Sequence, residues 1–253
     1  MTERVPEHLF SEAHYLGRPA DADDLIIRRR VALTRAWKGF CNSEAQLLEI
    51  GCGNGASLML LHQEFKSCLG VELFPEHEAV FQQLKTAYQA DNCQFQKHNI
   101  EQTPVSGNFS RLISFEVIEH LRTEDAVAHY FQSLQPGGMA VFSVPNKWWI
   151  FETHGAKLPL LPWNRVPFFS WLPRPLHERW ANARIYTRRR IVKLLEKHGF
   201  EVQETAYVTA PLDVLKNGPL KRFLQRYIFR GDTTSVPFLS TSILVKAIRP
   251  KDA

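Results

Sequence analysis

The chain has 253 residues, of which 44% are hydrophobic and 23% are charged, and this composition is typical of a soluble globular protein. Its formal net charge of +5 permits an anionic partner but does not require one. The longest apolar runs are too short to cross a membrane, and the first residues contain no apolar core segment, so we expect neither a membrane span nor a signal peptide. The four cysteines, Cys41, Cys52, Cys68 and Cys93, form no CxxC pair, which favours a reducing cytoplasm and argues against a structural zinc site.

The first predicted element is a helix over residues 25–40, and we assign residues 1–44 to an N-terminal helical cap. Three acidic residues in the stretch 21–24 precede the helix and would complement the positive end of its dipole. The helix carries the consecutive arginines Arg28–Arg30, each of which taken singly is best explained as part of a solvated basic face.

A glycine-rich turn follows the apolar run over residues 47–50 and precedes a helix predicted over residues 56–66. Three glycines fall within five residues, at Gly51, Gly53 and Gly55, so the backbone can take positive φ angles and approach a ligand closely. Free N–H groups at the start of a helix favour an anionic or polar part of such a ligand. The turn is therefore the first candidate binding site.

Taken alone, this turn fits two kinds of cofactor. With Ala56 it matches the dinucleotide pattern G-x-G-x-x-A, and Glu72 lies at a suitable distance to bind two ribose hydroxyls in either kind of site. Glu49 ends the preceding strand, two residues before the first glycine. A carboxylate there can receive an ammonium group or a bridging water, whereas a diphosphate gains nothing from its charge. A nicotinamide dehydrogenase stays the competing interpretation at this point.

Strands and helices alternate through the middle of the chain. We expect further strands over residues 68–72, 93–97, 109–115 and 139–144, and helices over residues 75–88 and 123–134, with a turn at 135–138. This alternation predicts an α/β fold with a doubly wound parallel sheet, whose ligand lies at the carboxyl ends of the strands.

The C-terminal part predicts one more helix, with Thr187 as its N-cap and Gly199 just after its end. Residues 200–207 and 236–248 read as a final antiparallel pair of strands. Between them, residues 219–230 form a basic amphipathic stretch to which the sequence assigns no role.

Two further motifs decide between the cofactors. The strand over residues 109–115 runs into the sequence F-E-V-I-E-H-L, and the next strand lies between L-x-P-G-G and the pair Pro145-Asn146. Together with E-x-G-x-G-x-G, these resemble the motifs of class I S-adenosylmethionine (SAM) dependent methyltransferases, in particular the ubiquinone-pathway O-methyltransferase-like and methyltransferase type 11 families. The resemblance covers residues 45–146 well and residues 186–205 more weakly. A nicotinamide dehydrogenase has no reason to repeat these elements at these spacings.

The resemblance implies a Rossmann-like, doubly wound, seven-stranded sheet, mostly parallel with an antiparallel C-terminal strand, and SAM as the cofactor. It also implies that Asn99 meets the adenine amino group, where an Asp is usual, and that Ile100 packs on the ring; the amide oxygen of Asn99 can still accept a hydrogen bond. The full set of cofactor-binding residues expected from the motifs is Glu49, Gly51, Cys52, Gly53, Gly55, Glu72, Leu73, Asn99, Ile100, Phe115 and Glu116.

We expect a single methyltransferase domain over residues 1–253, made of the cap, a SAM-binding core (45–146), a lid insertion after the fifth strand (147–182) and the C-terminal part of the sheet (183–253). In the resembled family the cap lies over the ligand mouth, so Tyr15 or one of the cap arginines could meet the SAM carboxylate. The insertion is rich in aromatic residues and prolines. It reads equally as an apolar acceptor pocket and as a small satellite core.

The acceptor chemistry centres on Glu116, Glu119 and His120, which share one face if the turn after the fourth strand is helical. Two carboxylates and an imidazole would suit Mg²⁺ or another divalent ion, with His154 as a fourth ligand. The ubiquinone-pathway O-methyltransferases and small-RNA 2′-O-methyltransferases that the chain resembles here use a metal. Many class I methyltransferases carry a similar run without metal, with the first acidic position near the methionine part of SAM. The alternative therefore makes His120 a structural cap or a base, with His154 as the other candidate catalytic residue.

The function predicted from the sequence is methyl transfer from SAM to a hydroxyl, in preference to an amine, of an apolar or aromatic small molecule. An RNA 2′-O-methyltransferase and a non-catalytic SAM-binding partner subunit are the alternatives. The chain lacks a recognisable RNA-binding domain, which argues against nucleic acid as the partner. Basic residues around the insertion would suit contact with an anionic membrane surface as well as a solvated face. We therefore expect a cytoplasmic protein able to associate with membranes, with its oligomeric state left open.

Overall fold

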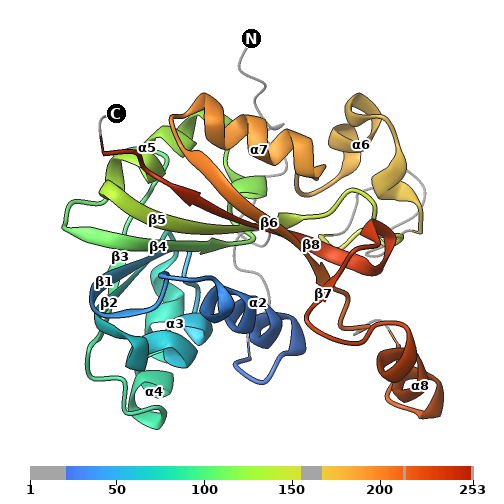
Figure 1. Ribbon diagram of the computed structural model, residues 1–253, viewed down its shortest axis with the longest axis horizontal. Coiled ribbons are helices and arrows are strands. Elements are labelled where there is room, and N and C mark those ends of the chain that lie inside the picture. The colour runs from blue at the N-terminus through green and yellow to red at the C-terminus, as the bar shows by residue number, and fades with distance from the viewer. Residues whose placement is uncertain (1–20, 155–166, 213–214, 252–253) are drawn as a thin grey trace.

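Figure 1 shows the protein as a computed structural model that describes residues 21–154, 167–212 and 215–251. The strands are β1 (Asn42–Ile50), β2 (Phe65–Glu72), β3 (Cys93–Lys97), β4 (Phe109–Phe115), β5 (Leu134–Pro145), β6 (Glu201–Thr209), β7 (Thr233–Thr234) and β8 (Ser240–Ile248). The α-helices are α2 (Leu25–Ala36), α3 (Ala56–Leu61), α4 (Glu78–Ala87), α5 (Val127–Ser133), α6 (Arg174–Trp180), α7 (Arg188–Lys197) and α8 (Pro219–Tyr227). Short 3₁₀ helices cover His62–Glu64, Pro75–His77, Ile118–His120, Glu124–Ala126, Phe169–Trp171 and Pro237–Leu239.

The strands form one twisted sheet in the order β3-β2-β1-β4-β5-β8-β6-β7. Helices α5 and α7 cover one face, and α2, α3 and α4 cover the other (Figure 1). The first five strands are mutually parallel, whereas β8 runs antiparallel to both β5 and β6. The doubly wound, mostly parallel sheet with an antiparallel C-terminal part is thereby confirmed. The expected count of seven strands is one too low, because the two-residue β7 pairs with the end of β6.

The central strands are buried on both faces, as a parallel sheet covered by helices requires. Leu47, Leu48 and Ile50 of β1 and Leu112 and Ile113 of β4 have no more than 1% of their surface exposed. Their side chains point alternately to the two faces, so they contribute to two separate apolar clusters, one under each helical layer. The clusters fix the strand ends, and these ends carry the polar residues of the site.

Two helices end earlier than the sequence predicts. The helix expected over residues 25–40 stops at Ala36, since Trp37 is extended and Gly39 takes a φ of +77°. The helix expected over residues 56–66 stops at Leu61 and gives way to a 3₁₀ turn. Strand β2 then begins at Phe65, three residues before the expected start, because Phe65 pairs with Asn42 of β1. Tertiary pairing outweighs helix propensity at this position.

Near the C-terminus the helix predictions are confirmed and the strand boundaries are corrected. The Thr187 side chain accepts the Arg190 backbone N–H, and Gly199 takes a φ of +92° after the helix. The last strand begins at Ser240 and not at residue 236, since Pro237 cannot donate to a strand ladder and opens a 3₁₀ turn. Residues 135–138, expected as a turn, belong to the start of β5.

Among the described residues, no helix combines the length and apolar character needed to cross a bilayer. Part of the expected lid insertion, residues 155–166, and the expected SAM contact Tyr15 lie outside the described residues.

Candidate active site

A cavity of about 240 Å³ opens at the carboxyl ends of β1, β2 and β4. The strand order reverses between β1 and β4, and open α/β sheets bind ligands at such a reversal. The lining residues come from α2, the glycine turn and the segments that follow β2, β3 and β4: Ile27, Arg30, Glu49, Ile50, Gly51, Cys52, Gly53, Asn54, Ala56, Ser57, Val71, Glu72, Leu73, His77, His98, Asn99, Ile100, Glu101, Phe115, Glu116, Val117, His120 and Leu121. All but Gly55 of the predicted cofactor-binding residues line this cavity.

The glycine turn brings the backbone to the cavity in three left-handed steps. Gly51, Gly53 and Gly55 have φ angles of +73°, +51° and +80°. A Cβ on Gly51 would lie 2.3 Å from Val117, and one on Gly55 would lie 2.5 Å from the Phe81 ring. A Cβ on Gly53 would meet no atom within 4 Å. Gly51 and Gly55 therefore serve close packing, whereas Gly53 faces open space where a ligand can approach.

Glu72, at the end of β2, is held by backbone donors on both sides of the cavity. Its Oε2 accepts the Gly53 N–H at 2.9 Å, and its Oε1 accepts the Leu73 N–H at 2.7 Å. These bonds tie the glycine turn to the end of the neighbouring strand. They also fix the carboxylate. Oε1 accepts a second backbone N–H, from Phe74 at 3.3 Å, so Oε2 is the oxygen that keeps acceptor capacity for a ligand hydroxyl.

Glu49, at the end of β1, is a buried carboxyl with one unsatisfied oxygen. Burial raises the pKa of this carboxyl well above its ordinary value, and a hydrogen bond from the Ser57 hydroxyl acts in the opposite direction. Its Oε2 has no hydrogen-bond partner among the residues that the structure describes. A buried acceptor without a partner is costly, and an ammonium group in the cavity would satisfy it.

Asn99 and Ile100 follow β3, as expected, and both line the cavity. The Asn99 Oδ1 accepts the Glu101 backbone N–H at 2.9 Å, so it closes a local turn. The second lone pair of this oxygen is what stays available for a ligand. Ile100 is buried and presents an apolar wall beside it.

The turn after β4 is not the regular helix on which the shared-face prediction depended. Glu116 takes a φ of +59°, and only Ile118–His120 form a short 3₁₀ turn. A non-glycine residue in this region costs about 1–3 kcal/mol and persists where its surroundings hold it. The Glu116 Oε1 accepts the Ser143 hydroxyl at 2.6 Å and lies 3.0 Å from the Arg30 guanidinium. These contacts hold the strained turn.

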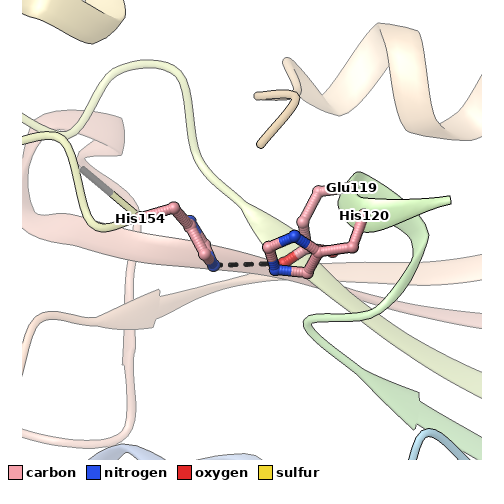
Figure 2. Close-up of side chains that lie close together, drawn as sticks. All are labelled: Glu119, His120 and His154. Carbon is pink, nitrogen blue, oxygen red and sulfur yellow. Dashed lines mark ion pairs between the residues drawn. The ribbon is translucent and has the colours of Figure 1, made fainter. Parts of the chain in front are cut away.

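Glu119 is buried, and neither of its carboxylate oxygens has a hydrogen-bond partner within the described ranges. Burial, together with the nearby Glu116 carboxylate, raises the pKa of this carboxyl well above its ordinary value. Figure 2 shows Glu119 and His120 close to His154, which comes from the segment after β5. His154 Nε2 lies 3.5 Å from Glu119 Oε1 and 3.9 Å from Glu116 Oε2.

One ligand atom from each of Glu119, His120 and His154 can be chosen so that all three lie within 4.8 Å of one another. The two imidazole rings meet edge to face, with centroids 5.0 Å apart. The unsatisfied oxygens of Glu119 suit a cation, since two imidazoles and a carboxylate are a common ligand set for a divalent metal. The expected fourth-ligand position of His154 is thus close to the other members.

The three cap arginines have different environments. Arg30 lines the cavity and pairs with Glu116. The Arg29 guanidinium is buried and donates to the backbone oxygens of Thr209 and Ala210, so it joins α2 to the end of β6. Arg28 is exposed and pairs with Asp23. Of the three, only Arg30 is placed to meet a ligand in the cavity.

Glu152 and His177 form a buried pair that the sequence did not suggest, and this pair holds the backbone of His154 in place. The Glu152 Oε1 accepts the His154 backbone N–H at 3.1 Å, and its Oε2 lies 2.7 Å from His177 Nε2. Both side chains of this pair have no exposed surface. The separation of 25 positions in sequence between Glu152 and His177 hides the contact from any local pattern. The one local signal in the sequence is that Glu152 lies two residues before His154.

Comparison with known proteins agrees with this geometry. Residues 21–205 match the family described as "Methyltransferase domain". No curated protein sequence matches the chain significantly. The S-adenosylmethionine dependent methyltransferase from Mesorhizobium loti shares 16% identity, with a TM-score of 0.61 over 90% of this chain and 100% of its own.

Two further solved structures extend the comparison. The complex between the Haloferax volcanii Trm112 methyltransferase activator and a methyltransferase gives a TM-score of 0.61 at 14% identity, over 93% of this chain and 97% of the other. Magnesium protoporphyrin IX methyltransferase from Synechocystis with bound SAM gives 0.54 at 15% identity, over 90% and 80%. At these identities the likeness establishes the fold, while the family match covers most of the chain. The chain therefore belongs to the class I SAM-dependent methyltransferases.

Proposed function

We propose that this methyltransferase transfers the methyl group of SAM to a hydroxyl of an apolar or aromatic small molecule. The observation that carries the proposal is the group of two imidazoles and two carboxylates beside the cavity. The sulfonium of SAM supplies an already activated methyl group, so the acceptor is the partner that needs help. A hydroxyl must lose its proton to become a good nucleophile, whereas a neutral amine carries a free electron pair.

In the proposed reaction an acceptor oxygen attacks the methyl carbon in line with the departing sulfur. The new C–O bond forms as the S–C bond breaks, S-adenosylhomocysteine (SAH) leaves, and the hydroxyl proton passes to His120 or His154. Both imidazoles lie beside carboxylates that would stabilise the imidazolium. The contribution of the chain is to align donor and acceptor and to hold this base.

For the cofactor, the proposal assigns one role to each strand end. Glu49 receives the ammonium group of the methionine part, and Glu72 binds the ribose hydroxyls. Asn99 and Ile100 bind the adenine, while Phe115 lines the same cavity. The unsatisfied Glu49 Oε2 and the open space above Gly53 support these assignments.

We also propose that Glu116, Glu119, His120 and His154 hold a divalent metal ion such as Mg²⁺. The support is the spacing of ligand atoms of Glu119, His120 and His154, together with the two Glu119 oxygens, which accept no hydrogen bond within the described residues. Glu116 is added because its Oε2 lies 3.9 Å from His154 Nε2. When bound, the ion would act as a Lewis acid that lowers the pKa of the acceptor hydroxyl. Loss of turnover in chelator, with recovery in excess Mg²⁺, is the expected result. Unchanged turnover in chelator would leave the histidines as the base without metal.

The first experiment is calorimetric titration of the protein with SAH. We expect Glu72→Ala to weaken binding about ten- to a hundredfold, because charge-assisted hydrogen bonds contribute about 1.5–3 kcal/mol. Glu76→Ala removes a nearby exposed carboxylate and is the matched control. Equal SAH affinity in Glu72→Ala and the control would contradict the assigned cofactor site.

The acceptor class is tested separately with a panel of phenols, quinone precursors, polyketides, lipids and amines. Methylation of hydroxyls alone supports the proposal, and methylation of amines alone overturns it. Turnover of RNA with steeply salt-dependent binding would replace it by RNA 2′-O-methylation. SAH binding without turnover of any acceptor would point to a non-catalytic partner subunit. The cytoplasm is the proposed compartment, with contact to a membrane surface.

A further inference from the structure

Helix α8 projects from the rest of the molecule and is strongly basic. It stands apart from the two helical layers, at the lower right in Figure 1. Five basic residues and no acidic residue occur in the stretch 215–231: Lys216, Lys221, Arg222, Arg226 and Arg230. The next acid along the chain, Asp232, lies 3.8 Å from Arg29, so its charge is partly compensated from the body of the protein.

The side of α8 that faces away from the protein is apolar along one edge. Leu220, Phe223 and Tyr227 are 64%, 55% and 60% exposed. Leu224 packs inward near Trp149. At about 100° per residue, Leu220, Phe223 and Tyr227 share one stripe, with Arg226 about 60° and Arg222 about 100° around the helix from Phe223. Three large apolar side chains exposed to water in one row mark a surface that contacts a partner.

The aromatic and basic groups of α8 are already in contact. The Phe223 and Tyr227 rings lie 4.8 Å apart between centroids, and the Arg226 guanidinium lies 5.8 Å from the centre of the Tyr227 ring. Such a mixture of rings and cations is typical of a helix lying in the interface of a membrane, where rings enter the acyl boundary and cations meet lipid phosphates.

A second exposed group, which we call the aromatic patch, consists of Trp148, Phe168, Trp171 and Phe238. Its rings touch in series, since Trp171 contacts both Phe168 and Phe238, and Phe238 contacts Trp148, with centroids 4.9–5.8 Å apart. Tryptophan is enriched at membrane interfaces because its ring is apolar and its N–H is polar.

The segments that carry α8 and the aromatic patch join the sheet at the edge where the cavity lies. Pro145 at the end of β5 pairs with Ser242 near the start of β8, and Thr209 at the end of β6 pairs with Ser240. Trp148 follows β5, Phe238 precedes β8, and α8 follows β6. All three segments therefore begin at the carboxyl edge of the parallel strands, where the catalytic residues lie.

We propose that α8 and the aromatic patch dock this protein on the interface of a membrane that contains anionic lipids. The five cations supply the attraction to lipid phosphates, and the exposed Leu220 together with the exposed rings supplies the apolar contact that the acyl boundary of a membrane buries. The use of this docking rests on the proposed function, because an apolar acceptor could then enter the site from the bilayer. Docking itself needs neither SAM nor turnover.

The test is co-sedimentation with vesicles at near-physiological salt. One set contains phosphatidylcholine alone, and in the other about a third of the lipid is phosphatidylserine. We expect binding to the anionic set only, with a blue shift of tryptophan fluorescence. Arg222→Gln/Arg226→Gln should weaken it about thirtyfold, since each basic residue near the surface contributes about fivefold. Phe223→Ser/Tyr227→Ser should weaken it as well.

The matched control is Arg188→Gln/Arg189→Gln, which removes the same charge from exposed positions on α7. It should bind vesicles like the wild type, and every variant should keep its SAH affinity and melting temperature. Equal loss in the control would reduce the effect to net charge and overturn the assigned surface. Wild-type protein that ignores anionic vesicles but binds polyglutamate would replace the membrane with an acidic protein partner. Neither outcome depends on whether a methyl acceptor has been found.

Discussion

Gly53→Ala tests the proposal that SAM passes close to the backbone of the glycine turn. The three glycines of the turn share positive φ angles, yet they differ in what an added methyl group would meet. At Gly51 it would lie 2.3 Å from Val117 and at Gly55 2.5 Å from Phe81, whereas at Gly53 it would meet nothing within 4 Å. An added methyl group at Gly53 therefore meets no protein atom and, on the proposed function, takes its space from the ligand.

The expected cost to stability differs between the positions. A left-handed conformation costs an L-residue about 1–2 kcal/mol, so Gly53→Ala should lower the melting temperature by about 2–8 °C at this chain length. Gly51→Ala carries the same backbone cost and must also displace Val117. Overpacking of this kind adds about 1–3 kcal/mol, and Val117→Ala in the same chain should return part of the loss.

Calorimetric titration with SAH and thermal unfolding without ligand together separate the two effects. We expect Gly53→Ala to be folded at 25 °C and to bind SAH at least about tenfold more weakly, which is a loss of about 1.4 kcal/mol. Gly39→Ala is the control for backbone strain, because Gly39 has a φ of +77° and does not line the cavity. Wild-type SAH affinity in a folded Gly53→Ala protein would refute the inference that the ligand passes over this residue.

Three further predictions concern charged groups of the site. Glu152→Ala should lower kcat more than about tenfold while SAH affinity stays near the wild-type value, because it removes the acceptor of the His154 backbone N–H and changes no residue that lines the cavity; steady-state kinetics beside calorimetry check this. Burial raises the pKa of Glu49 in the folded protein, so its contribution to stability is greatest below the unfolded pKa and is lost as pH rises through the folded pKa. Glu49→Gln should thus flatten the fall in melting temperature above about pH 4.5 and weaken SAM binding, and an unchanged slope would exclude Glu49 as its source. Binding of SAM by the wild type should release a proton near neutral pH, seen as a binding enthalpy that changes with the ionisation enthalpy of the buffer; no buffer dependence would mean that the carboxyl does not receive the ammonium group.

The polar residues that the strands bring to the cavity could be predicted from the sequence because each lies at the carboxyl end of its own strand. Glu49 and Glu72 lie at the ends of β1 and β2, and Asn99 lies just after β3; parallel strands bring these ends to one edge of the sheet. Local patterns that predict the strands therefore also predict which polar side chains meet. The predicted strand boundaries are less accurate where pairing with a neighbouring strand extends a strand, as at Phe65, which pairs with Asn42 of β1.

For the turn after β4, the sequence predicts which residues gather but not the backbone conformation that gathers them. The residues Glu116, Glu119 and His120 do gather, yet the helical spacing that suggested this is absent. The positive φ of Glu116 depends on Ser143 of the adjacent strand and on Arg30 of the cap, which lie 27 and 86 residues away in sequence. No local signal marks a non-glycine residue for that conformation, because the force that holds it is tertiary.

The acceptor half differs from the cofactor half in how it is assembled. His154 is oriented by Glu152, Glu152 is paired with His177 of α6, and the Asn182 side chain donates to the His154 backbone oxygen. These contacts lie within the segment between β5 and α7, and none of them involves Glu49, Glu72 or Asn99, which line the cavity at the strand ends. Substitutions in this segment can thus change the acceptor and the position of the base while Glu49, Glu72 and the glycine turn keep their geometry. This separation explains why the sequence predicts SAM directly, whereas the acceptor must be inferred from the side chains that the fold gathers around His154.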